Sequence, residues 1–292
     1  MMAAALQPAQ VWPQVSLSPA PQAIGRAATR ALYHELALSP KPGLVTLTDN
    51  GSHRDMDAQT FMRSLFALRG YFVAISELGQ QNADFAALER CGIQAEAHML
   101  AATGGINTHR GAIFMLGLLC AAAGAASASG AAPTPARLRL ALRHHWGGAL
   151  AARASRTPTL PGGIAAQKHG LRSASQEAAL AFPVLFETAV PALAAGLARG
   201  LSPMQARLDT LFHVMAVLDD SNLAHRGGLA GLHHARQSAR SFLAAGGAAR
   251  PGGMEAAQAM GVDFKARNLS PGGSADTLAA ACWMVQLCAS AP

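Results

Sequence analysis

The chain has 292 residues, enough for one large domain or two small ones. Hydrophobic residues make up 51% of it and charged residues only 13%, so much of the chain must lie in an interior. The net charge of +7 is carried mainly by scattered arginines without a basic run, which argues against nucleic acid and favours a small acidic ligand such as a nucleotide.

The first 20 residues are rich in proline, alanine and glutamine, which predicts a disordered leader ahead of a domain over residues 21–292. They have neither the basic start nor the long apolar stretch of a secretion signal. The four cysteines form no CxxC pair and are typical of buried thiols in a reducing compartment. We therefore expect a cytoplasmic protein.

The hydrophobic pattern that follows is helical. Apolar residues at 61, 65, 68 and 72 have helical spacing behind Asp57, a suitable N-cap. Residues 111–132 predict a buried helix that runs into a flexible loop and is too weakly apolar to cross a membrane. Ser202 followed by Pro203 predicts a helix start, and residues 278–288 predict a further helix after Ser274.

Stretches rich in glycine, proline and alanine at residues 121–135, 157–163 and 244–253 predict loops. The chain shows no alternating strand pattern, and its alanine content favours helix. We therefore predict a single all-α domain of about nine to eleven helices, with the active site in the loops between them.

Three His-Arg dipeptides lie in polar segments, at residues 50–55, 107–111 and 222–228, each with an asparagine two or three residues upstream. An amide, an imidazole and a guanidinium together offer hydrogen bonds, a titratable site and a fixed positive charge. This combination suits a polyanion that carries sugar hydroxyls. We expect the three segments to build one polar pocket.

The first polar region holds Lys41 between two prolines, which either direct its ammonium group at a phosphate or merely end a helix. Shortly after it come His53, Arg54, Asp55 and Asp57. Two carboxylates in this spacing can bind Mg²⁺ together with phosphate oxygens. Asp57 can instead simply cap the following helix, or do both.

The second region places Asn107, His109 and Arg110 behind two glycines at a helix start, where free backbone N–H groups can bind an anion. An ordinary glycine-containing loop is the alternative. In the third region we interpret Asp219 and Asp220 as acids at the C-terminus of a helix, where they oppose its dipole. Arg226 or a divalent cation would then compensate them, unless they form a purely structural salt bridge.

A fourth polar region, residues 268–276, is a glycine-rich entry to a helix with Ser274 as its expected N-cap. Alone it is faintly similar to the phosphate loop of small-molecule kinases.

In chain order, residues 40–45, 50–57, 107–111, 220–228 and 268–276 resemble the triphosphoribosyl-dephospho-CoA synthases, a family that serves citrate lyase and malonate decarboxylase. The likeness spans about residues 25–290, and residues 49–57 look closer to the malonate decarboxylase branch. Residues 169–178 follow the family pattern only loosely, so no role is assigned to Arg172 and Glu177.

The resemblance implies that ATP and 3′-dephospho-CoA give 2′-(5″-triphosphoribosyl)-3′-dephospho-CoA and adenine, with Mg²⁺ on the triphosphate. The product would pass to a phosphoribosyl-dephospho-CoA transferase and an acyl carrier protein. Neither nucleic acid nor a membrane is expected as a partner, and a homodimer is compatible with the sequence.

The motifs and the resemblance together assign candidate residues to three roles. The candidates for catalysis are Asp55, Asp220, His53 and His225. The candidates for metal binding are Asp55, Asp57, Asp219 and Asp220. The candidates for substrate binding are Lys41, Asn50, Arg54, Asn107, His109, Arg110, Asn222, Arg226, Asn268, Ser270, Gly272, Gly273 and Ser274.

Two alternatives stay open. A kinase that uses the loop at residues 271–274 would release ADP. A non-catalytic helical nucleotide-binding protein would release nothing.

Overall fold

A computed structural model describes residues 18–130 and 132–289. The predicted leader falls almost entirely outside the described residues. Within them the chain is all helical, as predicted, but it holds thirteen α-helices, more than the nine to eleven expected. Their bounds are α1 Pro21–Leu36, α2 Ala58–Ala67, α3 Arg69–Gln80, α4 Phe85–Thr103, α5 Arg110–Ala128, α6 Pro135–Ala154, α7 Pro161–His169, α8 Ala174–Ala179, α9 Val190–Ala198, α10 Pro203–Met215, α11 Ser221–Ala244, α12 Gly253–Ala266 and α13 Gly272–Ala289, with a π-helical turn η1 at Leu185–Ala189 and a 3-10 turn η2 at Gly247–Ala249.

Several predicted boundaries are confirmed. The Asp57 side chain caps α2 by accepting a 2.8 Å hydrogen bond from the Thr60 N–H. Ser202 caps α10 and forms a reciprocal capping box with Gln205, and Pro203 is the first residue of that helix.

Other boundaries are wrong. The apolar stripe at residues 61–72 is shared between α2 and α3, which meet at Leu68. The loop predicted from residue 121 begins only after Ala128, because buried alanines continue α5.

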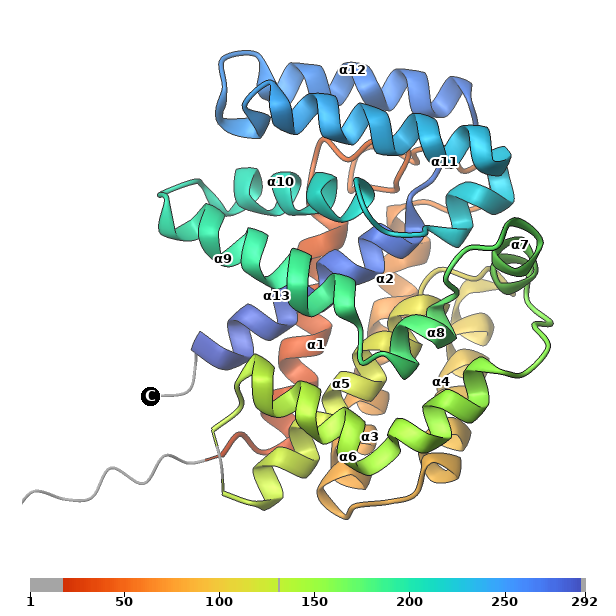
Figure 1. The fold of residues 1–292 in the computed structure, drawn as a ribbon, viewed down its shortest axis with the longest axis vertical. Coiled ribbons are helices and arrows are strands. Elements are labelled where there is room, and N and C mark those ends of the chain that lie inside the picture. Colours follow the sequence, from red (N-terminus) through yellow and green to blue (C-terminus); the bar gives the residue numbers. More distant parts are fainter. Residues whose placement is uncertain (1–17, 131, 290–292) are drawn as a thin grey trace, which may run out of the picture.

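Helices α1 and α13 run through the middle of the molecule, with α3–α6 on one side and α9–α12 on the other (Figure 1). A hydrophobic core is continuous from Ile24 in α1 to Leu287 in α13. The short helices α7 and α8 connect the two sides, since α7 packs on α11 and α8 packs on α6.

Helix α5 is the apolar centre of its side of the fold. It is long and apolar enough to cross a membrane by length and composition, but 72% of that stretch is buried inside the described protein. Its backbone touches that of α3, because a Cβ added at Gly79 would lie 2.0 Å from the Ala121 carbonyl oxygen. A Cβ at Gly124 would lie 2.0 Å from the Ser76 carbonyl oxygen. The composition of α5 is therefore that of a core helix.

Candidate active site

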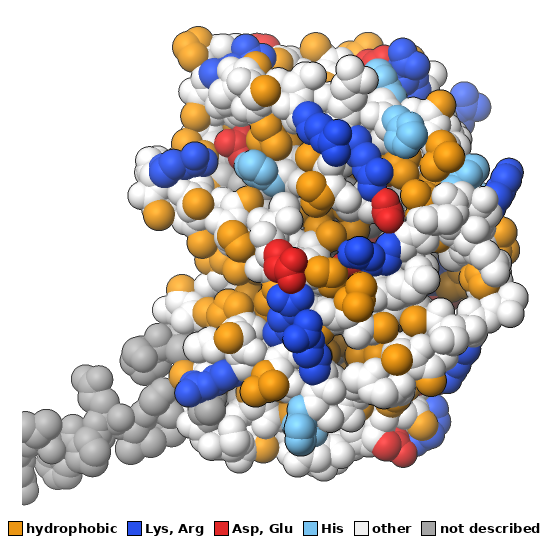
Figure 2. Space-filling model, in the orientation of Figure 1, with side chains coloured by type: hydrophobic (Ala, Val, Ile, Leu, Met, Phe, Trp, Pro, Cys, Tyr) orange, Lys and Arg blue, Asp and Glu red, His pale blue; other side chains and the backbone are white. Residues whose placement is uncertain are grey.

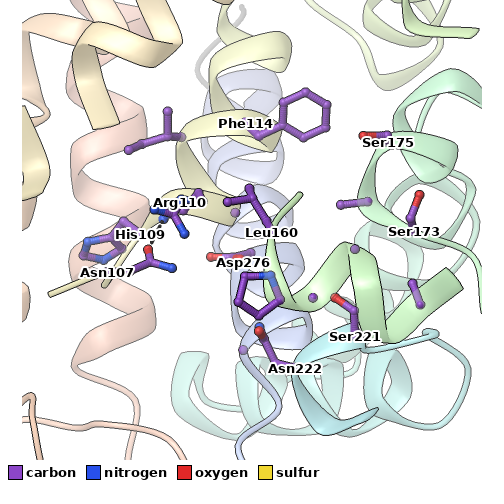
Figure 3. Close-up of a pocket in the computed structure, with 18 of the residues that line it drawn as sticks. Asn107, His109, Arg110, Phe114, Leu160, Ser173, Ser175, Ser221, Asn222 and Asp276 are labelled. Atoms are coloured by element: carbon purple, nitrogen blue, oxygen red, sulfur yellow. Dashed lines mark hydrogen bonds between the residues drawn. The ribbon is translucent and has the colours of Figure 1, made fainter. Parts of the chain in front are cut away.

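A cleft of about 1700 Å³ opens between the two sides of the fold, and it is lined by residues of α1–α8, α11 and α13 and of the loops between them. The N-terminal ends of α5, α7, α8, α11 and α13 all contribute to its wall. Asn107 and Arg110 lie on one side of Asp276, Ser173 and Ser175 lie on the other, and Asn222 lies beneath it (Figure 3). Because a helix N-terminus carries partial positive charge and free N–H groups, this wall is suited to anions.

The expectation of one pocket built from several polar segments is confirmed, because members of all three His-Arg segments line the cleft. The predicted site residues in its wall are Lys41, His53, Asp55, Asn107, His109, Arg110, Asp219, Asn222, His225, Arg226, Ser270 and Gly272. The remaining predicted residues do not line it, and they are Asn50, Arg54, Asp57, Asp220, Asn268, Gly273 and Ser274.

His53 is held at the cleft wall by Ser270. Its Nε2 atom lies 2.9 Å from the hydroxyl of the buried Ser270, and its Nδ1 atom lies 3.9 Å from the Asp55 carboxylate. Burial lowers the pKa of His53, and the charge of Arg226 acts in the same direction against the opposing effect of Asp55. His53 is therefore neutral at pH 7 and can accept a proton.

The start of α5 carries a second histidine, which is fully enclosed. His109 is 3% exposed, and its Nδ1 atom lies 2.6 Å from the hydroxyl of Ser64. Burial, reinforced by the positive charge of Lys41, lowers the pKa of His109 to about 3. His109 is one of the residues that line the cleft, and its Nε2 atom is enclosed without a hydrogen-bond partner in the described chain.

Arg110, the next residue, points its guanidinium along the cleft wall to Glu96 on α4. Its Nε atom donates a 2.6 Å hydrogen bond to the Glu96 carboxylate, and the pair is about 30% exposed. The Arg110 backbone N–H donates to the Asn107 side chain at 3.2 Å. Arg110 is therefore positioned but still reachable by a ligand.

Lys41 is buried rather than solvated, which excludes the simple helix stop. Its side chain is 1% exposed, and its ammonium group donates to both the backbone carbonyl and the carboxylate of Glu35 on α1. Burial lowers the pKa of Lys41, whereas the Glu35 carboxylate raises it. This ion pair places one positive and one negative group at the bottom of the cleft.

The interpretation of Asp219 and Asp220 is wrong in one respect. Helix α10 ends at Met215, and the two acids precede α11, so they lie at a helix N-terminus, where the dipole favours them. The carbonyls at the end of α10 are satisfied instead by Arg236 and Arg240 of α11, which donate to the carbonyl oxygens of residues 216–218.

The Asp220 side chain, which lies behind the cleft wall, forms hydrogen bonds with the N-terminal ends of both α11 and α13. It is 1% exposed and accepts hydrogen bonds from the backbone N–H groups of Asn222 and Leu223 as the N-cap of α11. Its other oxygen accepts from the backbone N–H and hydroxyl of Ser274, at 2.8 and 2.9 Å. Ser274 is therefore not the N-cap of α13, which begins two residues earlier at Gly272.

Arg226 connects two loops at the rim of the cleft. Its Nε atom donates to the Asn268 carbonyl oxygen at 2.8 Å, and its terminal nitrogen donates to the Asn268 side chain and the Ser52 carbonyl oxygen. The same loops are joined by the Ser52 hydroxyl, which donates to the Leu269 carbonyl oxygen at 2.6 Å. Asn268 thus acts on the site through Arg226, while His225 beside it is exposed at the cleft.

Asp276, on α13, is a wall residue that sequence reasoning missed. It accepts a hydrogen bond from the Ala112 N–H in the first turn of α5. The absence of a side chain at Gly111 makes room for it, because a Cβ there would lie 2.0 Å from an Asp276 carboxyl oxygen. Burial, followed by the negative charges of Glu35 and Asp220, raises the pKa of Asp276 well above its usual value.

The far wall holds arginines that were also missed or left unassigned. Arg153 and Arg156 both contact Glu89 of α4, and the Arg153 guanidinium stacks 5.1 Å from the Phe114 ring. Arg172 pairs with Glu177 at 2.7 Å. Five of these six residues line the cleft, all but Glu177. On the face drawn in Figure 2, basic side chains occur in separate groups, some of them beside acidic side chains.

The carboxylates fit a magnesium ion that arrives with phosphate better than a site made by protein alone. No group of three or more His, Cys, Asp or Glu residues within the described chain is placed to hold a metal ion. Asp57 is engaged with Thr60, and both Asp219 oxygens are engaged, by the Arg172 N–H and by Arg236. Asp55 lines the cleft with its carboxylate 64% exposed, which suits Mg²⁺ already bound to phosphate.

Comparison with known proteins agrees with a cleft for phosphate-bearing ligands. The family described as ATP:dephospho-CoA triphosphoribosyl transferase matches residues 21–291. A probable 2-(5″-triphosphoribosyl)-3′-dephosphocoenzyme-A synthase of Vibrio cholerae is 38% identical over 275 residues, covering 91% of this chain and 88% of its own. Its namesakes from Acinetobacter calcoaceticus and Salmonella gallinarum are 36% and 39% identical, covering 89% and 86% of both chains. No solved structure matches.

The chain therefore belongs to the ATP:dephospho-CoA triphosphoribosyl transferase family. It is an enzyme, a transferase, which excludes the non-catalytic nucleotide-binding alternative.

Proposed function

We propose that the protein transfers the 5-triphosphoribosyl group of ATP to the 2′-hydroxyl of 3′-dephospho-CoA and releases adenine. The observation that carries this proposal is the convergence of five helix N-termini and several arginines on one large cleft. Both substrates carry phosphate chains, and the ATP triphosphate must be bound without being cleaved. Dipoles and guanidinium groups bind phosphate in this way without supplying a nucleophile.

The cleft also supplies a base for the acceptor hydroxyl. His53 is neutral, is oriented by Ser270 and faces the cleft beside Asp55. We propose that His53 is the general base that accepts the proton of the 2′-hydroxyl, and that Asp55 stabilises the resulting imidazolium. His225, exposed on the same wall, is assigned to substrate contact.

Asp55 and Asp219 are the two predicted metal-binding acids that line the cleft, and we propose that Asp55 contacts Mg²⁺ carried by ATP. The ion would neutralise phosphate charge. Lys41, Arg110 and Arg226 provide the remaining positive charge on this side of the cleft.

The kinase alternative finds no support at its own loop. The backbone N–H and hydroxyl of Ser274 are both occupied by Asp220. A phosphate at residues 271–274 would have to displace a buried carboxylate.

The resemblance of residues 49–57 supports placing the product in the malonate decarboxylase branch. We propose that it passes to a phosphoribosyl-dephospho-CoA transferase and then to an acyl carrier protein, in the cytoplasm.

The test is mass spectrometry of the purified protein with MgATP and 3′-dephospho-CoA. We expect free adenine and the triphosphoribosyl adduct in equal amounts. The 2′-deoxy analogue of dephospho-CoA, which lacks the attacking hydroxyl, should give no adduct. Release of ADP in place of adenine would refute the proposed reaction.

Arg110→Ala should weaken ATP binding by about 1.5–3 kcal/mol, the usual range for hydrogen bonds to a charged group. The physical reason is that the guanidinium lies on the cleft wall beside the start of α5 and remains accessible. Isothermal titration with ATP at fixed Mg²⁺ measures the change. Arg267→Ala is the matched control, because Arg267 forms a comparable ion pair with Asp263 outside the cleft. Unchanged affinity in folded Arg110→Ala protein would remove Arg110 from the binding site.

A further inference from the structure

Two titratable side chains, His109 and Asp276, lie near the start of α5, and the roles proposed above for proton transfer and Mg²⁺ contact use neither of them. His109 precedes the helix as its N-cap residue, and Asp276 from α13 lies against the Gly111 and Ala112 backbone in its first turn. Both side chains line the cleft. Figure 3 shows Asp276 in the middle of the wall, with the His109 and Arg110 segment at its side.

His109 has an unused hydrogen-bonding atom at this end of the cleft. Its side chain is almost fully buried, yet its Nε2 atom forms no hydrogen bond with any of the described residues. A buried polar atom without a partner costs about 1–3 kcal/mol. A heterocyclic base, which has ring nitrogens in its plane, can provide the missing hydrogen bond.

We propose that the start of α5 is the binding site of the leaving adenine, and that Asp276 is the catalytic acid that protonates it. This inference rests on the proposed function. The bond between C1′ of the ribose and N9 of adenine breaks, and its electron pair stays on adenine. Asp276 gives its carboxyl proton to the base, while the 2′-hydroxyl oxygen bonds to C1′ and releases its proton to His53. Solvent then returns a proton to Asp276 and removes one from His53, so no net proton is consumed.

The surroundings of Asp276 keep it in the form that can donate. The groups that face it are Glu35 on α1, which is itself paired with Lys41, Asp220 at the start of α11, and the Ala112 N–H on α5. The two acids and burial favour the protonated carboxyl, and the single N–H opposes them. A carboxylic acid kept protonated in this way is a suitable general acid.

Asp276→Asn is the direct test, because asparagine has the same shape and can keep the Ala112 hydrogen bond but cannot donate an acidic proton. With ATP we expect turnover to fall by about 10²-fold or more, the scale for lost general-acid catalysis. With 6-chloropurine riboside triphosphate, whose base leaves more easily without a proton, the loss should be at least tenfold smaller. A merely structural or binding residue would slow both substrates equally.

Gly111→Ala provides a second variant that keeps the acid but displaces it, because the added Cβ would overlap an Asp276 carboxyl oxygen. It should show the same preference for the chloropurine substrate. Equal losses on the two substrates in both variants, or near-normal adenine release by folded Asp276→Asn, would overturn the inference. The proposed function fails separately, if wild-type protein forms no adduct from ATP.

The pH dependence of stability reports on Asp276 without any substrate. When the pKa of a carboxyl is higher in the folded than in the unfolded protein, the protein loses stability as pH rises. For Asp276 the loss begins near the ordinary pKa of 3.8 and continues up to the raised pKa of the folded state. Asparagine has no such loss, so Asp276→Asn should gain stability relative to wild type between pH 4 and pH 7. Thermal unfolding at both pH values measures this, and a constant difference would contradict the protonated state.

Discussion

Replacing Asp220 by alanine should destabilise the folded protein by about 2–4 kcal/mol, as measured by urea unfolding at pH 7. Loss of the N-cap of α11 accounts for about 1 kcal/mol of this. Loss of the acceptor for the buried Ser274 N–H and hydroxyl, which are then left unsatisfied, accounts for about 1–3 kcal/mol more. The starts of α11 and α13 both form the cleft wall, so activity should fall together with stability.

Asp84→Ala is the matched control, because Asp84 caps α4 in the same way but at the exposed surface, accepting from the Ala87 N–H at 2.8 Å. It should cost about 1 kcal/mol, the usual value of an N-cap. Equal losses in the two variants would contradict the proposed connection of the helix starts. An Asp220→Ala protein that is as stable as wild type but turns over slowly would support a catalytic role for Asp220.

Gly79→Ala should destabilise the fold strongly, with a loss of about 3 kcal/mol in the free energy of unfolding. The new Cβ would lie 2.0 Å from the Ala121 carbonyl oxygen, so α3 and α5 must separate, and no flexible side chain can absorb the overlap. Overpacking of this kind costs about 1–3 kcal/mol, and backbone contact places Gly79 at the upper end. Urea unfolding measures the loss.

Gly148→Ala is the matched control, because it also adds one methyl group to a glycine within a helix. Gly148 lies inside α6, is exposed, and a Cβ there would meet nothing within 4 Å. Alanine should therefore stabilise the protein by about 0.5–1 kcal/mol through helix propensity. A similar gain at Gly79 would show that α3 and α5 are not in backbone contact.

Much of the fold was predictable because helical signals are local. The caps at Asp57 and Ser202 depend on residues within one turn, and both were identified from the sequence. The length of α5 was underestimated. An alanine-rich stretch forms either a helix or a loop, depending on whether another helix packs against it. Here α3 does so through Gly79 and Gly124, a contact that sequence spacing does not reveal.

The segments that form the site were predicted, but which of their side chains face the cleft was not. His53, His109 and Arg110 line the cleft as expected, whereas Asp220 faces away from it. The direction of the dipole at Asp219 and Asp220 depended on where α10 ended, and helix ends are the least reliable part of a sequence-based assignment.

Asp276 was overlooked because an acid in the first turns of a helix is ordinary. Only tertiary structure brings it onto the start of α5. The one local signal was Gly111, a glycine near a helix start that has no need of left-handed backbone and whose missing side chain leaves room for a neighbour.

Glu35 of the first helix and Asp276 of the last helix both line the cleft, although almost the whole chain separates them in sequence. Closing so long a loop costs chain entropy that local helix formation does not repay. A form in which α13 is not docked lacks Asp276, so we expect it to lack the complete site. Substrate that binds only the complete cleft stabilises all helices jointly, and ligand occupancy and folding cooperativity become one linked equilibrium.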